Sequence, residues 1–115
     1  GHPNIAEVAV VGVRDAVKGQ VPVGFAVVKD AAKIATAEGR AAMEKEVFAV
    51  VDKELGAIGR PARVHFVTLL PKTRSGKVLR RSIQAIAEGR DPGDLTTLDD
   101  PTGIEQVRSA VSGEV

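Results

Sequence analysis

IAEVAVVGVRDAVKGQVPVGFAVVK, residues 5–29, is the stretch that decides the fold. Valine dominates two runs in it, residues 5–13 and 21–29, and the segment between them is charged and contains a glycine. Because β-branched residues favour strands and polar residues with glycine favour turns, the stretch predicts two strands joined by a turn. Both runs are almost continuously apolar, which indicates a sheet buried on both faces and covered by helices.

Two further segments extend this pattern. Residues 40–55 carry apolar side chains at three- and four-residue steps and precede Gly56, which is typical of an amphipathic helix that ends at a glycine. Met43 and Phe48 within it are predicted to pack in the core. Residues 63–69 alternate well enough for a third strand and are bounded by prolines.

The C-terminal third of the chain is predicted to contain two helices joined by a loop. Residues 78–88 form a second amphipathic pattern that stops at Gly89, and residues 90–100 form the loop. Asp100 and Pro101 are typical of a helix start, and a short apolar stripe follows them. We therefore expect an α+β domain in which a small sheet, of three strands or more, is covered by two or three helices.

Composition limits the classes of function. The chain of 115 residues carries 16 basic and 15 acidic side chains, a balance that gives no reason to expect nucleic acid or an anionic membrane as a partner. There is no cysteine, which excludes disulfides and thiol chemistry. Its apolar runs are far shorter than the roughly 20 residues that span a bilayer, so we expect a cytoplasmic protein. The chain starts at Gly1 without a methionine, and we expect it to be part of a longer polypeptide.

One stretch carries an unusual local charge. Residues 71–81 (PKTRSGKVLRR) hold five cations and no acid, between the third strand and the second helix. Loops at such junctions present side chains to ligands, and Gly76 frees the backbone just before Lys77. A phosphate-binding P-loop is excluded, because that pattern needs glycine at position 71 and serine or threonine at position 78, where the chain has Pro71 and Val78.

Charge alone leaves two other interpretations of this basic stretch open. A solvated loop without a function fits it, and so does a contact with nucleic acid. The chain has three phenylalanines and neither tyrosine nor tryptophan, which leaves little for base stacking and disfavours the second interpretation.

The order of the residues is more specific than their charge. Residues 70–81 (LPKTRSGKVLRR) closely resemble the lysine loop of the adenylate-forming enzymes, specifically the AMP-forming acyl-CoA synthetases of the acetate and propionate branch. Residues 2–12 (HPNIAEVAVVG) and 18–20 (KGQ) are similar to the opening of the small C-terminal domain of these enzymes. Residues 88–101 (EGRDPGDLTTLDDP) most resemble the tail of propionyl-CoA synthetases. The resemblance covers essentially the whole chain.

The resemblance implies that residues 1–115 are a mobile C-terminal lid and that a large N-terminal adenylation domain is absent from the chain. Residues 90–115 would be its tail, with a short helix. Such enzymes join a short-chain carboxylate to ATP, release pyrophosphate, and pass the acyl group from AMP to coenzyme A. By the same resemblance Lys77 is the catalytic cation of the first step, and the supporting loop residues are Lys72, Arg74, Ser75 and Gly76. The lid alone is expected to be inactive.

Further sites follow from the resemblance alone. His2 and Ile5 match positions near a bound Mg²⁺, which is held mainly through backbone carbonyls. Asp52 stands where acetyl-CoA synthetases have an arginine that meets a coenzyme A phosphate, and an aspartate would repel that phosphate. Either the neighbouring Lys53 meets that phosphate instead, or coenzyme A is held by the N-terminal domain. Asp52 and Lys53 are therefore expected only to lie near coenzyme A. His65 is interpreted as a strand residue without a role.

An alternative interpretation concerns regulation. Enzymes of the family are regulated by acylation of the loop lysine, so the domain is alternatively a binding module and substrate for a protein lysine acetyltransferase, with a deacetylase as the opposing partner. Acylated Lys77 would be a neutral amide, which no longer stabilises phosphoryl charge.

Overall fold

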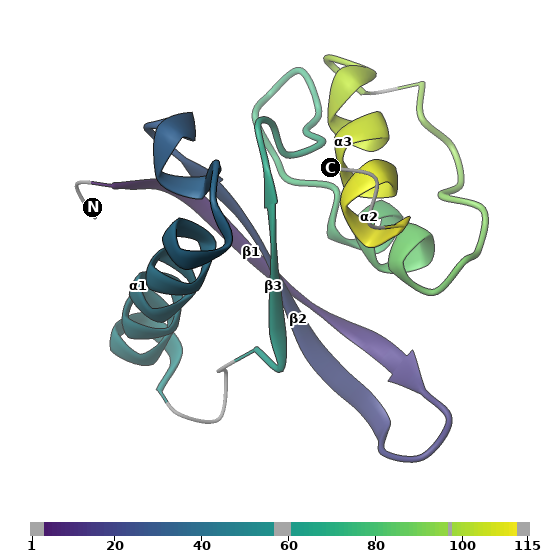
Figure 1. Cartoon of the computed structure of the whole chain (residues 1–115). Coiled ribbons are helices and arrows are strands. Elements are labelled where there is room, and N and C mark those ends of the chain that lie inside the picture. Colours follow the sequence, from purple (N-terminus) through teal and green to yellow (C-terminus); the bar gives the residue numbers. More distant parts are fainter. Residues whose placement is uncertain (1–3, 57–60, 97, 113–115) are drawn as a thin grey trace.

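The computed structural model describes residues 4–56, 61–96 and 98–112, arranged as Figure 1 shows. In this part of the chain the strands are β1 (Ile5–Asp15), β2 (Gly19–Val28) and β3 (Arg63–Val67). The helices are α1 (Ala37–Leu55), α2 (Arg80–Ala87) and α3 (Thr102–Ser112), with a 3₁₀ turn, η1 (Ala31–Ile34). The predicted α+β class is confirmed. The helices seen in the described ranges are too short or too polar to cross a membrane.

The sheet has the order β1-β2-β3, with β1 antiparallel to β2 and β3 parallel to β2. The turn between β1 and β2 is short, because Asp15 Oδ1 accepts hydrogen bonds from the backbone N–H groups of Lys18 and Val17 at 3.0 and 2.8 Å. The same two hydrogen bonds lower the pKa of Asp15. Gly19 completes the turn with a φ of 86°. Both strands therefore reach further toward the turn than their apolar runs predicted.

Helices cover both faces of the sheet, as the apolar strands predicted (Figure 1). On one face α1 lies over a core in which strand residues Ile5 and Ala26 meet Met43, Val47 and Val51. On the other face α2 and α3 lie over a larger core around Phe25, which is fully buried; it includes Ala9, Val11, Val23, Val67, Ile83, Ile86, Ile104 and Val107. Neighbouring strand residues contribute to different cores, because side chains alternate along a strand. Met43 is buried as predicted, whereas Phe48 is only half-buried.

Helix α1 begins three residues before the predicted start at Arg40. Thr36 is its N-cap, and the Thr36 Oγ1 accepts a hydrogen bond from the N–H of Gly39 at 3.0 Å. The first turn of α1 is largely exposed, so no apolar period marks it in the sequence. The predicted end is confirmed: Gly56 has a φ of 77°, and its N–H donates to the carbonyl of Asp52 at 3.0 Å. The turn η1 was not predicted.

The C-terminal third also departs from the predicted bounds. Strand β3 ends at Val67, two residues early, and α2 begins at Arg80 instead of residue 78, because residues 71–79 form hydrogen bonds of their own. Helix α3 begins where Asp100 predicted it, and Asp100 Oδ1 accepts a hydrogen bond from the N–H of Thr102 at 2.9 Å. Its apolar stripe packs in the larger core.

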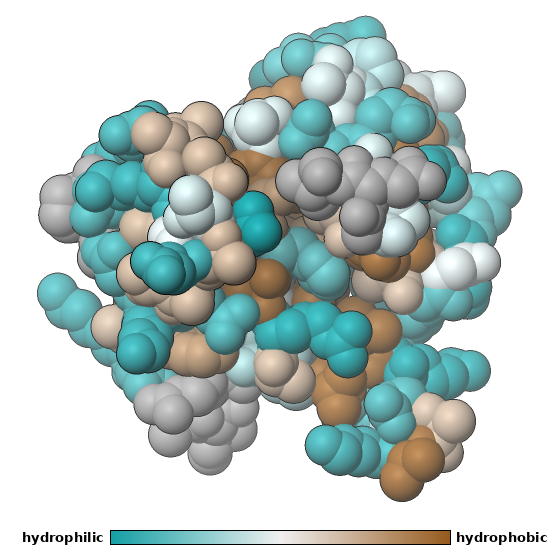
Figure 2. All heavy atoms as spheres, viewed as in Figure 1, coloured by the Kyte–Doolittle hydropathy of each residue, from teal (hydrophilic) through white to brown (hydrophobic). Residues whose placement is uncertain are grey.

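The hairpin formed by β1 and β2 extends beyond the helices at the end that carries its turn. Figure 2 shows hydrophobic side chains along this end of the molecule. Val13 and Val21 are only partly buried there, and Val17 in the turn is 91% exposed. The cover that the helices give to the sheet therefore stops short of the β1–β2 turn.

Candidate functional site

Residues 71–79, which we call the lysine hairpin, connect β3 to α2. Lys72 and Val78 face each other in an antiparallel bridge. The chain reverses at Gly76, whose φ of 90° lies in the left-handed region that residues with a side chain rarely adopt. The hypothesis that Gly76 frees the backbone just before Lys77 is confirmed.

Thr73 holds the backbone of Lys77 from both sides, and sequence analysis missed it. The N–H of Thr73 donates to the carbonyl of Lys77 at 2.9 Å, and Thr73 Oγ1 accepts a hydrogen bond from the N–H of Lys77 at 3.1 Å. Thr73 Oγ1 also lies 2.9 Å from Ser75 Oγ. A signal was present in the sequence, because threonine in a turn-rich stretch commonly bonds to backbone groups a few residues away.

The side chain of Lys77 is exposed. No carboxylate in the described part of the chain forms an ion pair with it. A concavity of about 430 Å³ adjoins the lysine, lined by Lys77, Val78, Leu79, Arg80, Arg81 and Ser82. The Lys77 ammonium is therefore open to an anion brought from outside the domain.

The surroundings of Lys77 are positively charged. Arg74 and Ser75 lie exposed near the reversal, and Arg80 and Arg81 open α2, whose first turn holds no acid. Lys72 differs from these residues because it forms an ion pair with Glu7 of β1. The predicted supporting residues therefore divide into an exposed group and one lysine that ties the hairpin to the sheet.

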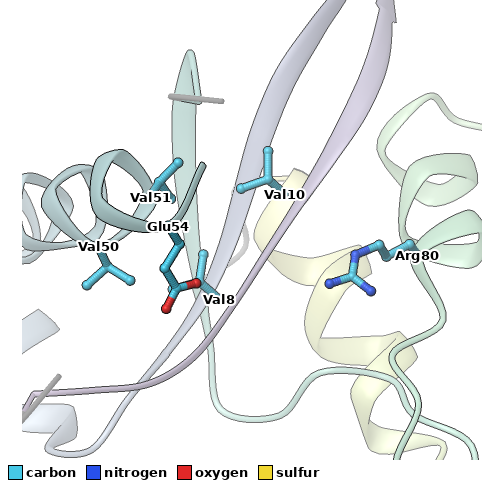
Figure 3. Close-up of a pocket in the computed structure, with 6 residues that line it drawn as sticks. All are labelled: Val8, Val10, Val50, Val51, Glu54 and Arg80. Atoms are coloured by element: carbon cyan, nitrogen blue, oxygen red, sulfur yellow. The ribbon is translucent and has the colours of Figure 1, made fainter. Parts of the chain in front are cut away.

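A second concavity, of about 300 Å³, lies between α1, β1 and the start of α2 (Figure 3). Glu54 of α1 and Arg80 stand on opposite sides of it, and Val8, Val10, Val50 and Val51 complete its lining. Asp52 and Lys53, the residues expected near coenzyme A, are on the same turn of α1 but are not in this lining; Asp52 is half-buried and Lys53 exposed. Arg80 lines both concavities, and sequence analysis gave it no role.

The predicted metal position is only partly covered by the structure. His2 lies outside the described residues, and the Ile5 side chain is buried in the core, so Ile5 could ligate a metal only through its carbonyl. Within the described ranges no three histidine, cysteine or carboxylate side chains gather as metal ligands. His65 stacks on Phe25, with ring centroids 5.2 Å apart. Burial lowers the pKa of His65, with a smaller effect of the nearby Arg63 charge, as suits a strand residue in a core.

Comparison with known proteins finds close relatives. The chain is 57% identical over 110 residues to the propionate–CoA ligases of Salmonella typhimurium and Escherichia coli, an alignment that covers 96% of this chain and 18% of each ligase. It is 48% identical to the acetyl-coenzyme A synthetase of Pyrobaculum arsenaticum, over 95% of this chain and 16% of that protein. The chain thus spans less than a fifth of the length of these relatives.

Solved structures share the fold. The acetoacetyl-CoA synthetase of Streptomyces lividans superposes with a TM-score of 0.72 over 99% of this chain and 17% of its own, at 16% identity. A benzoate CoA ligase from Burkholderia xenovorans LB400 gives a TM-score of 0.55 at 32% identity, over 72% of this chain and 16% of its own. The profile of the AMP-binding enzyme C-terminal domain matches residues 1–77. The chain therefore belongs to the family of AMP-binding enzyme C-terminal domains.

Proposed function

We propose that this domain is the catalytic lid of an AMP-forming short-chain acyl-CoA synthetase, and that Lys77 is its catalytic residue for adenylation. The observation that carries the proposal is an exposed ammonium, without an ion pair in the described ranges, on a backbone that hydrogen bonds from Thr73 hold in place. The reaction centre itself would be built by a larger N-terminal domain of the same polypeptide.

In the adenylation step a carboxylate oxygen attacks the α-phosphorus of ATP, and the bond to the β-phosphate oxygen breaks to release pyrophosphate. Two anions must meet, and negative charge spreads over the transferring phosphoryl group. The Lys77 ammonium would lower this barrier by electrostatic stabilisation and positioning, without transferring a proton. Loss of one such preorganised group costs about 3–4 kcal/mol of barrier, or roughly two to three decades in rate.

In the second step the coenzyme A thiol attacks the acyl carbonyl, and AMP leaves. We propose that the lid rotates between the steps, so that Lys77 withdraws and another face of the domain meets coenzyme A. The concavity between Glu54 and Arg80 lies on α1, β1 and α2, away from the reversal of the lysine hairpin, and is a candidate for that face. Asp52 and Lys53, on the same turn of α1 as Glu54, remain predicted to lie near coenzyme A.

Two features of the complete reaction extend beyond the residues of this lid. Similarity to relatives named propionate–CoA ligase supports propionate as the carboxylate substrate. The residues that select the acid would belong to the N-terminal domain. Magnesium would accompany ATP as the hard cation that phosphate oxygens prefer. His2 and Ile5 remain predicted to lie near the metal through their backbone carbonyls.

The test uses the full-length enzyme with Lys77→Ala, and Lys45→Ala as a matched control because Lys45 is an exposed lysine on α1. Pyrophosphate release from ATP and propionate should fall by about two to three decades in Lys77→Ala. Thioester formation from preformed propionyl-AMP and coenzyme A should persist, and the control should match wild type in both steps. An equal loss of both steps in Lys77→Ala would refute the assigned role.

A further inference from the structure

The segment between α2 and α3 lies against the lysine hairpin. Leu98 faces Thr73 in an antiparallel bridge, and the N–H of Asp99 donates to the carbonyl of Lys72 at 2.9 Å. Thr73 is the residue that holds the backbone of Lys77. The tail therefore lies beside the arm of the hairpin that contains Lys72 and Thr73, and the other arm of the hairpin contains Lys77.

A second contact follows at the start of α3, where Gly103 and Pro71 are both buried. A Cβ atom at residue 103 would lie 2.8 Å from the Pro71 Cα and 2.9 Å from the Pro71 nitrogen, closer than a Cβ atom comes to a non-bonded neighbour. The atoms it would meet are backbone, which cannot swing aside as a side chain can. Only glycine lets α3 begin directly against the first residue of the lysine hairpin.

Helix α3 is itself fixed to the rest of the domain. Ile104 and Val107 are buried in the larger core. Gln106 Oε1 accepts a hydrogen bond from the N–H of Thr68, just after the end of β3, at 3.1 Å. The contact between the start of α3 and the base of the lysine hairpin is therefore held in a fixed position relative to the larger core.

The far end of the hairpin has less support. Residues 74–77 are exposed, and a Cβ atom at Gly76 would meet nothing within 4 Å, so the reversal lies at the surface. On the side of the base that faces β1, the hairpin is tied to the sheet by the ion pair between Lys72 and Glu7, and an ion pair that is still partly exposed to water holds geometry weakly. The direction of Lys77 therefore depends on what fixes residues 71–73, together with Val78 and Leu79, which pack against the larger core on the other arm of the hairpin.

We infer that residues 98–103, which we call the tail strap, position Lys77 for adenylation, and that Gly103 is a positioning residue. This inference rests on the proposed function of Lys77. The family profile matches residues 1–77, so the strap lies outside that match. The strap contacts the hairpin base at Pro71, Lys72 and Thr73, so it acts through Lys77.

The experiment compares Gly103→Ala with Val47→Ala in the full-length enzyme. The added methyl group at residue 103 must displace Pro71, whereas Val47→Ala removes buried volume from the core on the opposite face of the sheet, away from α3. For Gly103→Ala we expect kcat for pyrophosphate release to fall about 10- to 100-fold, since a misplacement of roughly 1 Å costs that much. Its thioester formation from preformed propionyl-AMP should match wild type, and the KM for propionate should change little.

The control should lower the melting temperature while leaving the ratio of the two half-reaction rates unchanged. If Gly103→Ala lowers both half-reactions in proportion, or leaves both unchanged, the strap inference is overturned. Should Gly103→Ala not fold, Asp99→Pro, which removes the N–H donated to Lys72, must show the same selective loss. If Lys77→Ala abolishes adenylation and the strap variants do not, only the strap inference fails; if Lys77→Ala spares adenylation, the proposed function fails with it.

Discussion

Replacing Thr73 with valine should impair adenylation while leaving the fold intact. Valine has nearly the shape of threonine and the same branching, so the two backbone hydrogen bonds of Thr73, to Lys77 and from Gly76, should persist. The substitution removes the acceptor for the Lys77 N–H, at 3.1 Å, and the hydroxyl contact with Ser75, at 2.9 Å. Each such hydrogen bond contributes about 0.5–1.5 kcal/mol net, so the hairpin loses about 1–3 kcal/mol of conformational preference.

A loss of that size lowers the equilibrium ratio of correctly to incorrectly placed hairpins about 5- to 150-fold. Pyrophosphate release by the full-length enzyme should fall by up to that factor, and thioester formation from preformed propionyl-AMP should not. Thr73→Ser keeps the hydroxyl and should retain most of the activity. The reasoning is wrong if the valine variant matches wild type, if the serine variant is as impaired as valine, or if both half-reactions decline together.

Two further predictions concern charge. Hydrogen bonds from the Arg14 N–H, at 2.6 Å, and then from the Arg90 side chain, at 2.8 Å, lower the pKa of Glu88 below its ordinary value of 4.5. Ionised Glu88 therefore contributes stability above pH 4.5 that is lost as the pH falls through the lowered pKa. The melting temperature should drop as the pH falls below 4.5, and Glu88→Gln should make that drop shallower. An identical acid profile in the variant would contradict this prediction. Incubation with a protein lysine acetyltransferase and acetyl-CoA should acylate Lys77 ahead of Lys33 and Lys45 and ahead of Lys72, which is paired with Glu7; peptide mass spectrometry showing even modification of the four lysines would count against it.

The parts of the fold that periodicity encodes were predictable from the sequence. The two valine runs predicted a hairpin buried on both faces, and Gly56 and Asp100 marked helix ends that the structure confirms. The first turn of α1 was missed because an exposed turn has no apolar stripe, and only its cap, Thr36, marks it. Parallel pairing of β3 with β2 has no local signal, since it joins segments separated by a whole helix.

The candidate site was also predictable only in part. The charge of the basic stretch and the glycine before Lys77 pointed to the lysine directly, and the structure leaves that side chain exposed. The contacts of the strap with the hairpin were not predictable, because they join residues about 25 to 30 positions apart through backbone groups that any residue carries. Gly103 looked like an ordinary helix residue in the sequence, and only the approach of Pro71 gives it a reason.

The two cores on opposite faces of the sheet divide the domain into sectors with different tolerance of change. Because the two cores lie on opposite faces of the sheet, substitutions among Met43, Val47 and Val51 should combine additively with substitutions near α2 and α3. Natural or engineered substitutions in the core under α1 can therefore change one surface of the domain. The opposite surface, which carries Lys77, should keep its geometry.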